Sequence, residues 1–327
     1  MGNIMPKTNP FEGRVALLSD EDFAMLSQAV KERSCRERYG FGTLAEAAGL
    51  YRPAPPCPSC NDATPFHDGQ SDSGLCRFRC RLCGRRFNSL TATVLSCCKK
   101  DLPAWIDFIN LMRFNVPLDA AAEICLITHG TAYEWRHRVF AAVDGYQDHI
   151  VLRDRIWIDE TYVCDTDLTH GFGEARKRGL SNQQICIVVA IDTHKNLVAV
   201  VCGHGKPSSK RITGGLESHI LKGSIIVHDK ERAHNSLIKL TGCASETHKA
   251  NCADPVYLEC MAMVNNLCSW LKRYLWRFTG MDPSNLQSYL NWYVYLFRVR
   301  QSREKWPETE RVVRHLMMAN ASYRTSR

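Results

Sequence analysis

The stretch RIWIDETYV, residues 155–163, decides the fold of the larger part of this chain. Its β-branched and aromatic residues predict a strand, yet Asp159 places a charge inside this otherwise apolar run. A carboxylate among apolar neighbours is unfavourable unless it meets a cation. The strand is therefore expected to carry a polar site as well as part of the core.

Three further strands are predicted downstream of this stretch. QICIVVAID (184–192) and LVAVVCG (197–203) are joined by a turn at THKN, and SIIVHD (224–229) is a short apolar run that ends in Asp229. Helices are expected over about 208–221, 256–277 and 284–300. The order of three strands, a helix, a strand and then helices indicates a mixed α/β layer, not a repeated βαβ unit.

Composition and charge narrow the class of protein. The chain has 327 residues, 45% of them hydrophobic and 23% charged, as expected of a globular protein with two or three domains. No run approaches the roughly 20 apolar residues of a membrane span, and the start MGNIMPKTNP lacks a signal-peptide core. We expect a cytoplasmic, bacterial protein whose 16 cysteines stay reduced, so regularly spaced cysteines are interpreted as metal ligands.

Two CxxC knuckles define a cysteine module. Cys57-Pro-Ser-Cys60 and Cys80-Arg-Leu-Cys83 are separated by 19 residues, a spacing that lets two hairpin tips deliver four thiolates to one tetrahedral Zn²⁺. Four incidental buried cysteines are the alternative. A site with four protein ligands has no open position for substrate, so this zinc would stabilise the fold and do no chemistry.

A basic cluster surrounds the second knuckle. Residues 76–100 contain seven Lys and Arg residues and no acid, although the net charge of the whole chain is only +8. Such a cluster suits a polyanion, and a solvated basic face is the alternative. Contacts to DNA phosphates, without reading of base sequence, are expected from Arg77, Arg79, Arg81, Arg85 and Arg86.

The segment LDAAAEICLITHGTAYEWRHRVF, which begins at Leu118, matches a helix-turn-helix plan. A small-residue helix (119–125) is followed by a break at 127–130 and by a second helix that begins near Thr131. A plain helical hairpin that only packs the domain is the alternative. If the second helix faces DNA, the candidate contacts are Thr131, Tyr133, Arg136 and Arg138.

The run VNNLCSWLKR, residues 264–273, places two polar side chains on one side of a predicted helix. Asn265 and Lys272 are seven residues apart, which is almost two turns, so they point the same way at a spacing of about 10 Å along the axis. A polar side in solvent is the alternative. Together with Asp159 and Asp229, this helix completes a ribonuclease-H-like plan of metal-dependent nucleases and transposases.

WIDETYV, VHDKERAHNSL and VNNLCSWLKRYLWRFTGMDPSNLQSYLNWY, preceded by CRLCGRRFNSLTATVL and TAYEWRHRV, resemble one family. It is the insertion-sequence transposases of the DDE superfamily with an N-terminal zinc ribbon, in the branch whose catalytic set is Asp-Asp-Asn-Lys. The resemblance covers about residues 55–300. The chain departs from the pattern at His228, where a small hydroxyl residue is expected.

The resemblance implies a role for each matching residue. Asp159 and Asp229 would bind two Mg²⁺ or Mn²⁺ ions, Asn265 would take the third ligand position, and Lys272 would hold a phosphate. Glu160 points to the opposite face of its strand and would act at most around the metal ligands. Partners would be the DNA of the element ends and the target DNA, bound by a homo-oligomer.

The resemblance and the composition together predict five segments. They are an N-terminal helical segment (1–52), a zinc ribbon (53–100), a helix-turn-helix-like segment (101–150), a ribonuclease-H-like catalytic domain (151–300) and a basic tail (301–327). Two other functions remain open: a DNA-binding regulator without catalysis, and a metal-dependent nuclease that cuts without joining. Strand-transfer products would separate a transposase from both.

Overall fold

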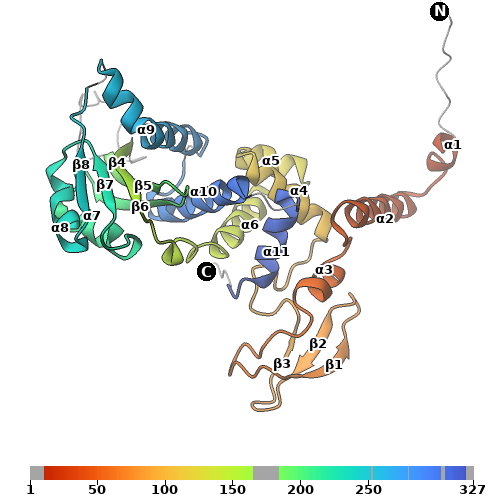
Figure 1. Cartoon of the computed structure of the whole chain (residues 1–327). Helices are drawn as coiled ribbons and strands as arrows, with labels where there is room; N and C mark the ends of the chain where they lie inside the picture. Colours follow the sequence, from red (N-terminus) through yellow and green to blue (C-terminus); the bar gives the residue numbers. More distant parts are fainter. Residues whose placement is uncertain (1–10, 165–183, 252, 279, 303–305, 322–327) are drawn as a thin grey trace, which may run out of the picture. The chain divides into compact units, whose positions relative to one another are not determined.

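The computed structural model describes residues 11–164, 184–251, 253–278, 280–302 and 306–321 (Figure 1). The chain forms two compact units, one of residues 1–109 and 312–318 and the other of 110–311 and 319–327. The predicted division into five segments is finer than these two units and stays a prediction. Parts of the predicted N-terminal segment, catalytic domain and basic tail lie outside the described residues.

Helices at the start of the first unit begin at the capping residues that the sequence supplies. After the short α1 (Glu12–Val15), α2 (Asp20–Tyr39) begins where Ser19 Oγ accepts from the Asp22 backbone N–H, and ends at Gly40 with φ of 82°. In α3 (Leu44–Tyr51), Thr43 plays the same capping role. The described part of the N-terminal segment (1–52) is thus helical, as predicted, and α2 and α3 make up most of it.

A three-stranded antiparallel sheet follows in the same unit. Its strands β1 (Phe66–Gln70), β2 (Cys76–Arg79) and β3 (Arg86–Asn88) lie in the order β1-β2-β3. Phe78 and Phe87 face each other across β2 and β3 and pack with Cys57 and Cys80 in a small buried cluster. So small a core leaves the module dependent on a further source of stability.

The second unit contains the predicted helix pair. α4 (Leu102–Arg113) leads from the first unit into it, and is followed by α5 (Leu118–Ile124) and α6 (His129–Ala141). α6 begins two residues earlier than predicted because Thr128 Oγ1 accepts from the Thr131 backbone N–H and so caps the helix. A 3-10 turn, η1 (Gln147–His149), precedes the sheet.

The centre of the second unit is a five-stranded mixed sheet (Figure 1). Its strands are β4 (Arg155–Cys164), β5 (Gln184–Asp192), β6 (Leu197–His204), β7 (Ile225–His228) and β8 (Ala244–Thr247), in the spatial order β6-β5-β4-β7-β8. β4 pairs antiparallel with β5 and parallel with β7, and β7 pairs parallel with β8. The predicted mixed α/β class is confirmed at this level.

Helices cover both faces of this sheet. On one face, Ile156, Ile158 and Val188 pack with α7 (Ser209–Leu216) and α8 (Asn235–Thr241) through buried Ile212 and Leu237. On the other, α9 (Pro255–Leu275) lies against β4 and β5, and α10 (Leu286–Gln301) lies against β6. The remaining elements are the 3-10 turns η2 (Glu217–His219), η3 (Arg232–His234) and η4 (Pro283–Asn285), and α11 (Glu308–Met318).

The predicted order of elements was wrong in omitting α8 and β8. The sequence of β8 is Ala-Ser-Glu-Thr, which lacks the apolar alternation of a recognisable strand. It lies at the edge of the sheet and pairs with a single strand, β7. Edge strands commonly carry polar or charged side chains, so an apolar sequence is not required there. The four predicted strands, which are β4 to β7, and the helices near α7, α9 and α10 are confirmed.

Candidate functional site

The two predicted aspartates lie on neighbouring parallel strands. Asp159 is in the middle of β4, and Asp229 directly follows β7. Trp157 pairs with Val227, so continuing this register by two residues brings Asp159 opposite Asp229. Neighbouring strands are about 4.8 Å apart. The pairing of β4 with β7 therefore brings the two aspartates near each other, close enough for the charge of Asp229 to act on Asp159.

The surroundings of Asp159 disfavour its charge. Burial raises the pKa of the Asp159 carboxyl to about 6, and the charges of Glu160 and Asp229 act in the same direction. A hydrogen bond from the Glu160 backbone N–H to Asp159 Oδ1, at 2.9 Å, acts against this shift. Asp159 is half-buried and feels the charges of two neighbouring carboxylates, those of Glu160 and Asp229. A bound cation would stabilise the ionised form of a carboxyl in this environment.

Helix α9 carries Asn265 and Lys272, and its residue Cys268 faces Asp159. Cys268 lies between them on the helix, and its thiol pKa is raised by burial and then by the charge of Asp159. Asn265 precedes Cys268 by three residues and Lys272 follows it by four, so the three share one side of α9. Asn265 is half-buried, whereas Lys272 is exposed and its charge acts on the Cys268 thiol.

One hydrogen bond holds α9 against the strand that carries Asp159. The indole Nε1–H of Trp157 donates to the Cys260 carbonyl at 2.8 Å. Trp157 and Asp159 are two residues apart on β4 and therefore share a face, so the bond to Cys260 and the contact with Cys268 lie on the same side of the sheet. The contacts that Trp157 and Asp159 of β4 make with α9 thus fix the position of the helix beside this strand.

The opposite face of the sheet holds a buried polar chain. Glu160 Oε1 accepts from His234 Nε2 at 2.7 Å, the Nδ1 atoms of His234 and His228 are 3.1 Å apart, and His228 Nε2 is 3.1 Å from Ser245 Oγ. His228 and His234 are 1% and 0% exposed. Burial, and then the charge of His234, lowers the pKa of His228 to about 4.

Sequence reasoning missed this chain. Glu160 is expected to act at most around the metal ligands, and no role is predicted for His234. Alternation along β4 nevertheless places Glu160 on the same face as Ile156 and Ile158. A carboxylate in register with core residues requires a buried partner. That signal was present in the sequence, but it does not identify His234, which is 74 residues away.

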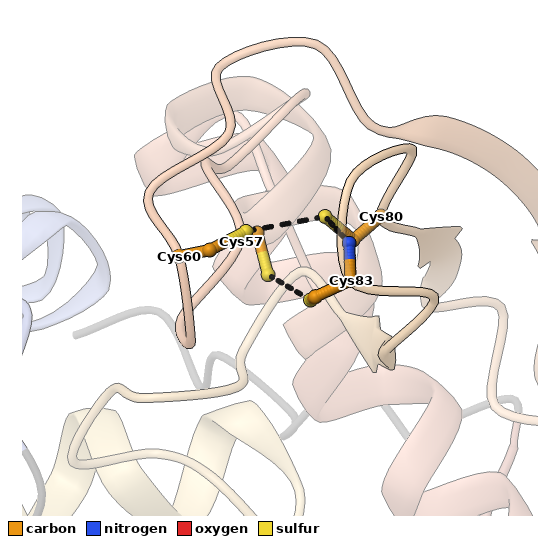
Figure 2. Close-up of side chains that lie close together, drawn as sticks. All are labelled: Cys57, Cys60, Cys80 and Cys83. Atoms are coloured by element: carbon orange, nitrogen blue, oxygen red, sulfur yellow. Dashed lines mark hydrogen bonds between the residues drawn. The ribbon is translucent and has the colours of Figure 1, made fainter.

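The four predicted zinc-ligand cysteines come together in the first unit (Figure 2). Cys57 Sγ is 3.6 Å from Cys83 Sγ, and Cys60 Sγ is 3.4 Å from Cys80 Sγ. These separations are close to the spacing of about 3.8 Å between thiolates bound to one tetrahedral zinc ion. The residues present therefore fit a Zn²⁺ ion.

Backbone hydrogen bonds shape both cysteine loops in the same way. The Cys57 N–H donates to the Asp62 carbonyl and the Cys80 N–H to the Arg85 carbonyl, each at 2.9 Å. Burial acts to raise the pKa of the Cys57 thiol, but backbone N–H groups of the loop outweigh it and lower that pKa to about 7. Burial raises the pKa of Cys80 to about 12. The backbone of the first loop thus favours the thiolate form of Cys57, which is the form that binds a metal ion.

All five predicted ribbon arginines are exposed. Arg77 and Arg79 flank buried Phe78 on β2 and therefore point to the outer face of the sheet. Arg86 of β3 pairs directly with Arg79 and lies on the same outer face. Arg86 also forms an ion pair with Asp68 at 3.2 Å. Arg81 lies over the Phe66 ring, and Arg85 hydrogen-bonds Ser59 Oγ.

The four candidates on α6 divide into two groups. Tyr133 is exposed and Thr131 half-buried. Arg136 is only 6% exposed, with its guanidinium 5.1 Å from the centroid of the Phe278 ring, and Arg138 forms an ion pair with Glu134 at 2.7 Å. Arg136 is buried against Phe278 and is therefore not part of the proposed DNA-binding surface.

None of the helices in the described part of the chain combines the length and apolar content that a membrane crossing requires. No family model matches the sequence, and no curated protein matches it. Among solved structures, a chain of the simian T-cell lymphotropic virus intasome in complex with PP2A regulatory subunit B56 gamma is 14% identical, with a TM-score of 0.29. The match covers 57% of this chain and 64% of that one, less than two thirds of its length.

Two structures of Mos1 are also similar. The strand transfer complex is 10% identical with a TM-score of 0.24, over 60% of this chain and 78% of that chain. The mariner paired end complex with Mn is 11% identical with a TM-score of 0.24, over 61% and 79%. TM-scores this low carry no argument about function, so a proposal for the function has to rest on the residues of the site.

Proposed function

We propose that this protein is a DNA transposase of the DDE superfamily, of the zinc-ribbon branch, which cuts the ends of its element and joins them to target DNA. The observation that carries the proposal is the meeting of Asp159 and Asp229 on parallel strands beside the side of α9 that bears Asn265 and Lys272. Three successive antiparallel strands, followed by a helix and a strand parallel to the first, fit the ribonuclease-H-like plan expected from the sequence.

Asp159, Asp229 and Asn265 would hold the divalent cations. The raised pKa of Asp159 supports this, because a carboxyl that is disfavoured as an anion gains most from a nearby cation. Mg²⁺ or Mn²⁺ supplies, when bound, activation of a water molecule and stabilisation of the leaving 3′ oxygen. Asn265 contributes a neutral amide oxygen where a glutamate would contribute a charge, so it holds a cation less strongly.

Lys272 would bind a DNA phosphate. Its ammonium group is exposed on the side of α9 that faces the carboxylates, where it can offset the charge of the scissile or an adjacent phosphate. In the first step the oxygen of water attacks phosphorus and the 3′ oxygen leaves. In the second, that 3′ hydroxyl attacks a target phosphodiester, whose own 3′ oxygen leaves.

The first unit would bind DNA without catalysing a reaction. A zinc ion held by Cys57, Cys60, Cys80 and Cys83 would stabilise the three-stranded sheet. This sheet presents Arg77, Arg79 and Arg86 on its outer face, a spacing that suits a phosphate backbone. Two element ends would be handled by more than one copy of the chain.

The test uses a labelled duplex made from the DNA that borders this gene, with a scrambled duplex as control. With Mg²⁺, the wild-type protein should cut the bordering duplex at one position and join the new 3′ end to a plasmid. Asp159→Asn should abolish both products, whereas Glu259→Gln, which changes an exposed carboxyl on α9, should leave them.

The other functions give different results in the same assay. A metal-dependent nuclease would cut and yield no joined product. A regulator would bind the bordering duplex and yield neither product, with or without Mg²⁺. Equal activity of wild type and Asp159→Asn would refute the proposed active site.

A further inference from the structure

A second metal site, built mainly of nitrogen ligands, is the inference that the buried histidines carry furthest. We propose that His228, His234 and Asp229 bind one transition-metal ion such as Zn²⁺, next to the carboxylates of the proposed active site. Their ligand atoms all lie within 4.8 Å of one another. This proposal does not depend on transposition, because metal binding can be measured by itself.

The two imidazole nitrogens are spaced as a pair of metal ligands would be. Their Nδ1 atoms are 3.1 Å apart, and the rings meet at 83°. Two nitrogens at about 2.0–2.1 Å from one ion are separated by about 2.9–3.4 Å for angles between 90° and tetrahedral. The observed separation falls within this interval, so one ion could contact both nitrogens with little movement.

The outer nitrogen of each ring has its own hydrogen-bond partner. Glu160 carboxylate only accepts, so His234 Nε2 carries the hydrogen and His234 Nδ1 presents a lone pair toward His228. His228 Nε2 is held by Ser245 Oγ. Ligand histidines in metal sites are held in the same way by a carboxylate or other polar group behind the ring.

Asp229 adds a carboxylate on the more accessible side. It is half-buried, while both histidines are fully buried, so an ion would enter past Asp229. Two neutral imidazoles and one carboxylate favour Zn²⁺ or Co²⁺ over Mg²⁺, which prefers oxygen ligands and retains its waters. Asp229 would thereby belong to both sites, and a bound transition metal would compete with Mg²⁺ for it.

A hydrogen-bonded chain without an ion is the competing explanation. In it, His228 Nδ1–H donates to His234 Nδ1 and Ser245 Oγ–H donates to His228 Nε2, so every polar atom of the chain has a partner. Both explanations account for the distances. They differ in whether the full chain takes up a metal ion beyond the one at the four cysteines.

The experiment adds Co²⁺ to full-length protein that carries a single equivalent of Zn²⁺, which the four thiolates bind in preference to a site of two imidazoles and a carboxylate. Cobalt bound to nitrogen and oxygen gives visible absorption without the thiolate charge-transfer band of a cysteine site, so the two sites are distinguished. We expect one equivalent to bind and to raise the melting temperature. No visible band and no shift in melting temperature would overturn the proposal directly, without any variant.

Two variants locate the ion. His234→Gln retains a group that can donate to Glu160 but removes Nδ1, and it should lose the cobalt band. Glu160→Gln removes the carboxylate behind His234 and should weaken binding about 10–100-fold. The matched control is His248→Gln, because His248 Nε2 also meets a carboxylate, that of Glu246, at 2.8 Å.

The control should bind cobalt as wild type does. Cobalt binding that persists unchanged in His234→Gln would mean that the ion lies elsewhere, and it would overturn the assignment. Circular dichroism of each variant, compared with wild type, excludes loss of binding through unfolding. Failure of the transposition assay, with the cobalt site intact, would leave this proposal standing and refute only the proposed function.

Discussion

Asp159 and Glu160 are consecutive on β4, but their carboxyl groups lie on opposite faces of the sheet. The charge of Asp159 raises the pKa of the Cys268 thiol in α9, whereas Glu160 accepts a hydrogen bond from His234 in η3. Successive side chains of a strand alternate between faces, so one dipeptide supplies both the proposed Mg²⁺ site and the buried histidine chain. A substitution of Asp159 therefore tests the proposed Mg²⁺ site, and a substitution of Glu160 tests the buried histidine chain.

Asp159→Asn should make the protein more stable at alkaline pH when no Mg²⁺ is present. The pKa of Asp159 is raised from 3.8 to about 6 on folding, so the stability that its protonated form contributes is lost as pH rises through 6. The difference between the two pKa values corresponds to at most about 3 kcal/mol. Urea unfolding at pH 5 and pH 8, with zinc retained, measures the part of this loss that falls between the two pH values, about 1.4 kcal/mol, because more than half of it has already occurred at pH 5. An identical pH dependence in variant and wild type would contradict the stated pKa.

Lys272→Ala should reduce strand cleavage about 100-fold while leaving the fold intact, because an exposed cation is lost from the proposed phosphate site. The matched control is Asn266→Ala. Asn266 is exposed on α9 but lies next to Asn265, about 100° around the helix. Rates of cleavage under single-turnover conditions give the comparison. Equal losses in both variants would point to a general effect on the helix.

Removal of zinc should unfold the cysteine module. The buried cluster around Phe78 and Phe87 is too small to hold the three strands without the metal. Chelation, or Cys60→Ser, should expose residues 53–100 to limited proteolysis, and Cys97→Ser should not, because Cys97 is exposed and outside the four-cysteine cluster. A module that resists proteolysis at zero zinc content would show that the metal is dispensable.

Arg79→Gln should weaken DNA binding uniformly across sequences. Arg79 lies on the outer face of the ribbon sheet, where a contact to phosphate would release a counterion. The slope of log K against log salt concentration should fall in magnitude by about 0.9. Arg33→Gln, which alters an exposed arginine paired with Glu37 on α2, serves as control. An unchanged slope in Arg79→Gln would remove that residue from the DNA-binding surface.

Gln147→Ala should destabilise the second unit by about 3 kcal/mol, since it leaves buried polar groups without partners. The Gln147 amide accepts from the Ala199 backbone N–H at 2.8 Å and donates to Asn291 Oδ1 at 2.7 Å. It thus links η1, β6 and α10. Chemical denaturation measures the loss. A change below 0.5 kcal/mol, of order of that for a surface substitution, would show that these bonds contribute little.

Local patterns were sufficient to predict the elements that carry the proposed active site. β-Branched and aromatic residues predicted β4, β5 and β6, and a short apolar run predicted β7. Asn265 and Lys272, seven residues apart, lie on one continuous helix, α9, and the CxxC spacing predicted the four-cysteine cluster. Each of these depends on residues close together in the chain, where geometry follows from helix, strand or turn. The polar edge strand β8 escaped the same analysis.

The sequence by itself determined which residues could form strands, helices and cysteine loops, because those properties follow from local periodicity and spacing. Only the tertiary structure decided that Asp159 lies within the electrostatic influence of Asp229, that Glu160 meets His234, and that Arg136 is buried against Phe278. These relationships join residues about 70 to 140 positions apart. Strand register and helix packing set them, and neither is encoded in any single stretch of the chain.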